Sequence, residues 1–255
     1  MVNNMKTVQV RNITLGQGIP KIAVPLVDTD REALVKQART VAALKPDVVE
    51  WRIDFYQDVT DYDKLGQTAT AIREVLGDIA LLMTFRTKGE GGNLTLADDQ
   101  YFQLCQVIAK GKMADLLDVE LEHDRQEIKQ VLDLAHRNGL KTIMSNHDFD
   151  KTPSETDIFS RLKEMAELGS DVAKLAAMPN NVTDVLTLLT ATNRAQEDLD
   201  IPVITMSMGD LGKVSRVAGQ VFGSALTFGA VGKTSAPGQI SLEDLRHDMA
   251  DLKLN

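Results

Sequence analysis

Cysteine is almost absent from the sequence, and no long apolar run is present. Cys105 is the only cysteine among 255 residues, which excludes an intrachain disulfide and a cysteine-rich zinc site and fits a reducing compartment. The N-terminal residues lack the apolar core and cleavage signature of a secretion signal. The longest uncharged stretch, residues 217–232, is too short to span a bilayer and contains glycine, serine and threonine. We therefore expect a cytoplasmic protein without a membrane segment.

The sequence also has fewer basic residues than acidic ones. The chain has 28 lysines and arginines against 37 acidic residues, a net charge of -9, so it offers no basic stripe to a phosphate backbone. We expect no nucleic-acid partner. A chain of 255 residues with 43% hydrophobic content suits two modest domains or one α/β barrel. No Pro/Gly/Ser-rich linker divides it, and we expect a single domain over residues 1–255.

Eight short segments, rich in β-branched residues or continuously apolar, recur along the chain. They begin at Lys21, Val48, Leu81, Leu116, Lys141, Asp171, Pro202 and Ser224. Their starts lie roughly 20 to 35 residues apart, the length of a strand plus a crossover helix. Eight such units predict a (β/α)₈ TIM barrel. A doubly wound sheet is the alternative, but it usually has fewer strands and a glycine-rich first turn, and residues 27–31 contain no glycine.

Residues 1–20 form an expected extension of the barrel. The segment T-V-Q-V-R-N-I-T-L-G alternates apolar and polar residues around Arg11 and Asn12, which predicts a β-hairpin that plugs the bottom of the barrel.

Two helix starts carry capping signals. Residues 152–155 read as a capping box with Pro153 at the first helical position, which makes Thr152 the expected cap. Ser241 followed by Asp244 resembles a second helix start.

Charged residues fall where a barrel brings side chains together. Alternate strand residues point into the lumen, and catalytic groups gather at the C-terminal ends of the strands. Six of the eight units contribute such residues: Glu50, Arg52 and Asp54; Arg86; Asp118, Glu120 and Glu122; His147; Lys174; and Arg216. A structural role is the alternative for some of them, because interior ion pairs also serve as scaffolding.

Lys174 is the most informative of these residues. It lies in the small, apolar run D-V-A-K-L-A-A-M, where no local counter-charge comes from its neighbours Val172, Ala173, Leu175, Ala176 and Ala177. Burial and nearby cations lower the pKa of a lysine, and a neutral amine attacks a carbonyl carbon to form an imine. Such chemistry requires a base, for which His147 has a suitable intrinsic pKa. The alternative is a structural lysine paired with carboxylates of the Leu116 segment.

Two glycine-containing loops are candidates for closing over a ligand. Residues 86–93 carry Glu90, and residues 232–239 carry Ser235 and Gln239. The run G-A-V-G-K-T does not form a P-loop, because Thr227 stands where that motif requires its first glycine.

Five motifs in order carry a resemblance to a known family. They are E-W-R-I-D, T-F-R-T-K-G-E-G-G, S-N-H-D-F, the lysine of the sixth strand and S-A-P-G-Q. From about Lys21 to the C-terminus, the chain closely resembles type I 3-dehydroquinate dehydratases. The resemblance implies a (β/α)₈ barrel, usually a homodimer, that dehydrates 3-dehydroquinate to 3-dehydroshikimate in the shikimate route to aromatic amino acids. It implies neither a metal nor an organic cofactor.

The resemblance also implies roles for individual residues. Lys174 forms the imine with the C3 ketone, His147 removes the C2 proton and assists departure of the C1 hydroxyl, and Glu90 orients His147. The implied substrate contacts are Glu50 and Arg52 to ring hydroxyls, Arg86 to substrate and Glu90, Met208 against the ring, Arg216 to the carboxylate, and Ser235 and Gln239 from the last loop. One departure is Pro25, where some relatives have a serine contact.

Three other functions share parts of this pattern. A class I aldolase uses the same lysine chemistry but normally needs a phosphate-binding glycine loop. A metal-dependent lyase would use Glu50, Asp118 and Glu120 as ligands. A non-catalytic carboxylate-binding barrel would keep Lys174 only as a cation.

Overall fold

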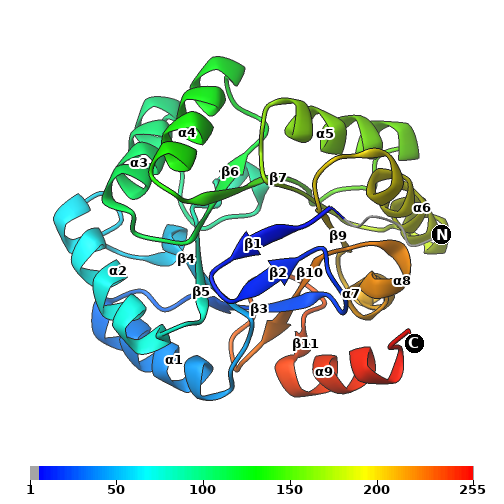
Figure 1. Cartoon of the computed structure of the whole chain (residues 1–255), viewed down its shortest axis with the longest axis horizontal. Helices are drawn as coiled ribbons and strands as arrows, with labels where there is room; N and C mark the ends of the chain where they lie inside the picture. Colours follow the sequence, from blue (N-terminus) through cyan, green and yellow to red (C-terminus); the bar gives the residue numbers. More distant parts are fainter. Residues whose placement is uncertain (1–5, 255) are drawn as a thin grey trace.

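A ring of helices surrounds a cylinder of parallel strands (Figure 1). The computed structural model describes residues 6–254. The strands are β1 Val8–Val10, β2 Ile13–Leu15, β3 Lys21–Leu26, β4 Val48–Arg52, β5 Ala80–Thr84, β6 Leu116–Glu120, β7 Lys141–Asp148, β8 Val172–Ala177, β9 Val203–Ser207, β10 Leu226–Ala230 and β11 Ile240–Ser241. The α-helices are α1 Arg31–Ala43, α2 Tyr62–Leu76, α3 Asp98–Gly111, α4 Arg125–Arg137, α5 Glu155–Glu167, α6 Val182–Asp198, α7 Lys213–Val217, α8 Gly219–Phe222 and α9 Leu242–Asp251. Two 3₁₀ turns, η1 Ile53–Phe55 and η2 Lys88–Glu90, follow β4 and β5.

The eight strands β3 to β10 form the barrel. Consecutive strands from β3 to β9 pair in parallel, and β10 pairs with β3. The seam between β9 and β10 closes through a bridge between Val203 and Ser224, with the Ala225 N–H donating to the Val203 carbonyl at 2.8 Å. The predicted TIM barrel is confirmed, because each predicted apolar segment supplies one of these strands.

Strand β4 shows how the alternation of side chains organises the barrel. All five of its residues are buried. Val49 and Trp51 belong to the outer core, which the helices cover, whereas Glu50 and Arg52 line a cavity in the lumen. Parallel strands in such a barrel are buried on both faces, so a charge on the inner face must find its partners among the other side chains of the lumen.

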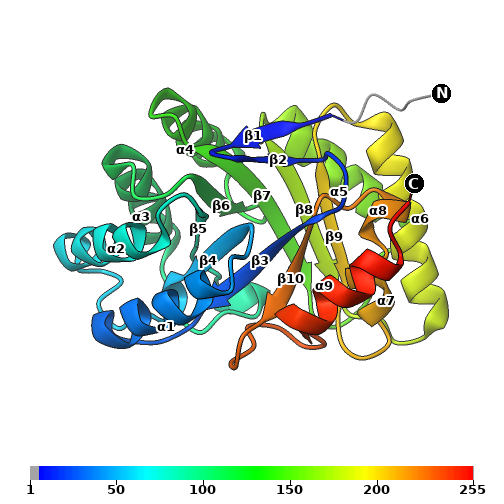
Figure 2. The same ribbon diagram turned by 60° about the horizontal axis from the view of Figure 1, so that its bottom comes forward.

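The hairpin of β1 and β2 closes one end of the lumen. Val8, Val10 and Leu15 are buried and pack into the same apolar cluster as inward-facing residues near the N-terminal ends of the barrel strands. Arg11 turns the chain with a φ of 51° and donates from Nη1 to Asp115 Oδ1 at 3.1 Å. Figure 2 shows the hairpin lying across the ends of the strands. The predicted plug is confirmed for residues 6–20, and residues 1–5 of the expected extension lie outside the described residues.

The two predicted helix starts have different outcomes. Ser241 caps α9 and accepts the Asp244 N–H, as predicted. The prediction for α5 was wrong by two residues, because Ser154 caps this helix and accepts the Asp157 N–H. The Thr152 hydroxyl donates instead to the Met178 carbonyl at 3.0 Å. Within residues 6–254, no helix has the length and apolar character needed to cross a membrane.

Leu15 tests the contribution of the plug to stability. Its side chain is fully buried, so Leu15→Ala removes apolar contacts and leaves a cavity. We expect the free energy of unfolding to fall by about 2–5 kcal/mol, measured by urea denaturation. Leu186→Ala on α6 is the matched control, because that leucine is 58% exposed. Equal and small losses in both variants would contradict a plug that is packed into the barrel.

Candidate active site

One cavity, of about 480 Å³ including its opening to solvent, is lined by all ten residues to which the family resemblance gave a catalytic or substrate-binding role. Because these residues lie in the middle of the strands, at their C-terminal ends or in the loops that follow, the cavity is at the barrel end opposite the hairpin. Its lining of apolar side chains with a few convergent polar groups suits a small-molecule ligand. The ten residues are Glu50, Arg52, Arg86, Glu90, His147, Lys174, Met208, Arg216, Ser235 and Gln239.

Lys174 lies in the middle of β8 and is 4% exposed. Its Nζ is 3.5 Å from Asp118 Oδ2 and 4.0 Å from Glu50 Oε1, and it lies 4.7 Å from the centre of the Phe228 ring. Burial lowers the pKa of this lysine, and the positive charge of Arg86 acts in the same direction against the two carboxylates. The site therefore favours the neutral amine more than water does.

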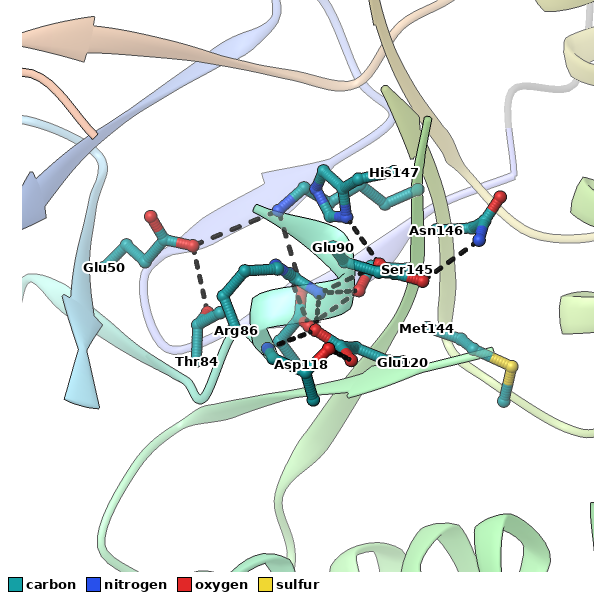
Figure 3. A network of polar contacts seen from close by, with 12 residues as sticks. Glu50, Thr84, Arg86, Glu90, Asp118, Glu120, Met144, Ser145, Asn146 and His147 are labelled. Atoms are coloured by element: carbon teal, nitrogen blue, oxygen red, sulfur yellow. Dashed lines mark hydrogen bonds and ion pairs between the residues drawn. The ribbon is translucent and has the colours of Figure 1, made fainter. Parts of the chain in front are cut away.

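Arg86 is the centre of a buried polar network (Figure 3). Its Nη2 donates to Asp118 Oδ1 at 2.8 Å, and its Nη1 donates to Glu120 Oε1 at 2.7 Å and to Ser145 Oγ at 2.9 Å. The same Nη1 lies 3.4 Å from Glu90 Oε2. Burial by itself would lower the pKa of Arg86, but the carboxylates more than offset this effect and hold the pKa above its ordinary value. Arg86 is thus permanently charged.

Glu90 and His147 form a hydrogen-bonded pair beside this network. Glu90 Oε2 is 2.8 Å from His147 Nδ1, and Glu90 Oε1 accepts from Asn146 Nδ2 at 3.0 Å. Burial raises the pKa of Glu90 to about 8 and lowers the pKa of His147 well below its usual range, where the charges of Arg86 and Lys174 add to the effect. Between the lowered pKa of His147 and about pH 8, Glu90 is therefore protonated and His147 is neutral. Because Nδ1 contacts Glu90, Nε2 is the nitrogen left for a ligand.

Asp54 fixes the guanidinium of Arg52. It accepts from Arg52 Nε at 2.7 Å and from Nη2 at 2.8 Å. The sequence places Asp54 on the strand, but the structure places it in η1, immediately after β4. It also accepts the Asn93 N–H at 3.0 Å, which ties the loop after β5 to β4. Arg52 Nη1 donates to the Ser235 carbonyl at 3.4 Å.

Arg216 differs from the other arginines of the site because it has no carboxylate partner among the described residues. It is 1% exposed, its Nη2 donates to the Pro237 carbonyl at 2.8 Å, and its buried Nε has no hydrogen-bond partner within residues 6–254. Burial lowers the pKa of Arg216 to about 10. This guanidinium is arranged to receive an anion from the cavity.

The loop after β10 lies over the cavity. The Ser235 N–H donates to Gln239 Oε1 at 2.9 Å, and Gln239 Nε2 donates to Ser235 Oγ at 3.1 Å. The Pro237 carbonyl also accepts the Gly209 N–H at 3.3 Å, so the loop is attached to the segment after β9. At Gly238, with a φ of 74°, a Cβ would stand 2.3 Å from the Gly209 carbonyl oxygen, so this close approach requires glycine.

The acidic residues of the β6 segment lie in two different environments, two of them buried and one exposed. Asp118 and Glu120 are buried beneath the cavity, where they neutralise Arg86. Glu122 was wrongly expected in the lumen: β6 ends at Glu120, and Glu122 is exposed. The Arg86 guanidinium lowers the pKa of Glu120 to about 2, although burial opposes this shift.

Three large apolar side chains of the cavity were missed from the sequence: Phe149, Met206 and Phe228. Phe228 could have been found, because it has the inward parity on β10. Phe149 follows β7, and its ring packs on Gly91, where a Cβ would stand 2.3 Å from the ring. Only the folded loop after β5 reveals that contact.

The ligand set required by the metal-dependent alternative is not assembled. In the part of the chain that the structure describes, no three histidine, cysteine, aspartate or glutamate side chains are arranged to hold a metal ion. Asp118 and Glu120 instead face Arg86, and Glu50 accepts from Thr84 Oγ1 at 2.9 Å. Pro25 pairs with Glu50 in the strand register but does not line the cavity.

Comparison with known proteins agrees with this geometry. A family model described as type I 3-dehydroquinase matches residues 22–252. The chain belongs to the type I 3-dehydroquinase family. All the cavity residues fall inside the matched range, from Glu50 to Gln239.

Relatives in the type I 3-dehydroquinase family match the chain along nearly its whole length. The 3-dehydroquinate dehydratase of Lactiplantibacillus plantarum is 56% identical over 248 residues, covering 97% of this chain and 98% of the relative. The crystal structure of type I 3-dehydroquinate dehydratase from Clostridium difficile with covalently modified comenic acid has a TM-score of 0.93 at 44% identity and covers 96% and 97% of the two chains. The enzyme structure from Geobacillus kaustophilus has a TM-score of 0.94 at 37% identity, with 97% and 96% covered.

Arg86→Met tests the buried network of this family member. The variant leaves Asp118 and Glu120 buried without their main counter-charge, so we expect a loss of about 3–5 kcal/mol in the free energy of unfolding. Arg194→Met is the matched control, because Arg194 is 43% exposed and its carboxylate partners are 3.6 Å away. We expect a change of about 1 kcal/mol or less for that surface arginine. Similar losses in both variants would show that Arg86 does not hold the carboxylates together.

Proposed function

We propose that the protein dehydrates 3-dehydroquinate to 3-dehydroshikimate through an imine on Lys174. The observation that carries this proposal is a buried lysine with a lowered pKa, in one cavity with a histidine whose Nε2 is left free for the ligand. Such an amine is a nucleophile toward a ketone. Membership in the type I 3-dehydroquinase family and the printed names of the relatives support this choice of substrate.

The first step joins enzyme and substrate. The neutral Lys174 amine adds to the C3 ketone, and the adduct takes up one proton from solvent and loses water to give a protonated imine. Asp118 and Glu50, at 3.5 and 4.0 Å from Nζ, stabilise that positive charge. The cation withdraws electrons from the neighbouring carbon and makes its C2–H bond more acidic.

The second step is the elimination. His147 Nε2 takes the C2 proton, and the electron pair moves toward the imine nitrogen to give an enamine. The enamine then expels the C1 hydroxyl, which leaves as water with the proton carried by His147. Glu90 stabilises the imidazolium formed between these events through its 2.8 Å contact with Nδ1. Hydrolysis of the imine releases the product and restores Lys174.

The remaining cavity residues match the polar groups of such a substrate. Arg216 receives the carboxylate, because its guanidinium has no carboxylate partner among the described residues. Glu50 and Arg52 face the ring hydroxyls, and Arg86 keeps Glu90 in place. Met208, which is 1% exposed, packs against the ring, while Ser235 and Gln239 cover the cavity.

The cellular setting is part of the proposal. The family resemblance supports a homodimer acting in the shikimate route, and the single cysteine supports the cytoplasm. Packing of the hairpin into the barrel core supports one domain over residues 1–255.

Borohydride reduction tests the imine. We expect 3-dehydroquinate plus borohydride to leave a mass adduct that peptide mapping places on Lys174, and Lys174→Ala to lose both the adduct and on the order of a thousandfold or more of turnover. Turnover without an adduct would move the reaction to metal or enolate chemistry. Binding without turnover would identify a carboxylate-binding barrel.

The pH dependence of kcat tests the pair of Glu90 and His147. We expect kcat to rise with pH as the pair loses the proton that Glu90 holds with a pKa of about 8. In Glu90→Gln only His147 titrates, and its pKa lies well below the usual range, so the rise should move to lower pH and the maximal rate should fall. An unmoved profile in Glu90→Gln would show that Glu90 does not share a titrating proton with His147.

His147→Ala should still form the adduct but dehydrate roughly a hundredfold to ten-thousandfold more slowly.

A further inference from the structure

Asn146 lies beside the catalytic pair but does not line the cavity. It stands between Ser145 and His147 on β7 and is 4% exposed. Because successive strand residues point to opposite faces, its side chain leaves the strand on the face opposite to that of His147. The motif S-N-H-D-F contains Asn146, but the family resemblance gave a role only to the histidine of that motif.

Two hydrogen bonds hold the amide of Asn146. Its Nδ2 donates to Glu90 Oε1 at 3.0 Å (Figure 3), and its Oδ1 accepts from Nη1 of Arg161, on α5, at 2.7 Å. A guanidinium carries only donors, so it fixes the carbonyl oxygen of the amide on its own side. The amide N–H is thereby directed at Glu90.

The two oxygens of Glu90 have different partners. Oε2 is 2.8 Å from His147 Nδ1 and 3.4 Å from Arg86 Nη1, whereas Oε1 accepts from Asn146. His147 brings no charge to this contact near pH 8, because burial lowers its pKa well below the usual range. Glu90 is 6% exposed, so without Asn146 its Oε1 would lose a hydrogen bond in a buried position. That loss is more costly for the carboxylate than for the neutral acid.

The charged groups around Glu90 also set how easily it ionises. Burial raises the pKa of Glu90 to about 8, Arg86 lowers it, and the carboxylates of Glu120 and Asp118 raise it. The hydrogen bond from Asn146 lowers the pKa of Glu90, because it stabilises the ionised form. Asn146 is itself a neutral group, so its effect does not depend on its own state of protonation.

We infer that Asn146 is a positioning residue for the proposed dehydration: held by Arg161, its amide donates to Glu90 and helps this carboxyl group to ionise beside the base. The inference rests on the proposed function, in which Glu90 acts on His147. An ionised Glu90 accepts the Nδ1–H of His147 and leaves the lone pair of Nε2 for the substrate proton. Without the amide N–H, the pair should reach this form only at higher pH.

Asn146→Asp tests this role, because aspartate keeps the shape and still accepts from Arg161 but replaces the N–H donor with an oxygen. We expect the rise of kcat with pH to move upward by about one unit or more, which is about a tenfold or greater loss of kcat below the rise. Asn146→Leu removes the donor without adding a charge and should move the rise upward by about one unit. KM should change little in both variants, since Asn146 does not line the cavity.

Arg161→Met tests how the amide is held. Asn146 keeps its N–H in this variant, but its amide is free to turn, so we expect a smaller upward shift of about half a unit. Asn146→Leu combined with Arg161→Met should match Asn146→Leu alone, because Arg161 acts through Asn146. Additive shifts would overturn the part of the inference that concerns Arg161.

Asn193→Asp is the matched control. Asn193 on α6 also donates from Nδ2 to a glutamate, Glu197 Oε1 at 3.2 Å, but it does so on the exposed surface. Its profile should coincide with that of the unsubstituted protein. Thermal unfolding of each variant establishes that the protein is folded at the assay temperature.

Two results would overturn the role of Asn146. If the profile of Asn146→Asp is unmoved, or is lowered by the same factor at every pH, Asn146 is a merely structural residue. Borohydride trapping in the same samples separates this failure from failure of the proposed function. An adduct on Lys174 with an unmoved profile overturns only the role of Asn146, whereas no adduct in the unsubstituted protein overturns the imine and, with it, this inference.

Discussion

The buried guanidinium of Arg86 is the constraint on which the rest of the site depends. An arginine that is 3% exposed is stable only among compensating charges, and strands β6 and β7 supply Asp118, Glu120 and Ser145 around it. These partners come from the two strands that follow β5 in the sheet, so the network exists only once β5, β6 and β7 lie side by side. Arg86 in turn holds Glu90, and Glu90 holds the base.

The lumen has an apolar layer at one end and a charged layer at the other. Next to the hairpin it is apolar and contributes stability through burial. At the other end, charged side chains share a volume from which the hairpin and the loop after β10 exclude much of the solvent. Electrostatic interactions are stronger in such a site than in water. The same burial therefore lowers the pKa of Lys174 and raises that of Glu90, so one physical cause prepares both a nucleophile and a proton carrier.

Much of this arrangement could be predicted from residue order. Apolar segments at the spacing of strand plus helix predicted the barrel, and inward parity predicted that Glu50, Arg52 and Lys174 share its lumen. The predictions failed where local signals compete. Thr152 and Ser154 are both good caps, and Glu122 continues an inward parity that ends when β6 ends. Parity also gives a direction without a depth, which is why Met206 was missed, and it does not apply to Phe149, which follows the end of β7.

The sequence by itself determined that a lysine lies in the middle of an apolar strand, with a histidine on the strand before it and arginines after others. Only the tertiary structure decided which charges neutralise one another. Arg86 and Arg216 both lie shortly after a barrel strand, but Arg86 is surrounded by carboxylates, whereas Arg216 has none among the described residues. The reason is that charge compensation depends on distances across the lumen, and these are set by closure of the barrel and by the path of each loop.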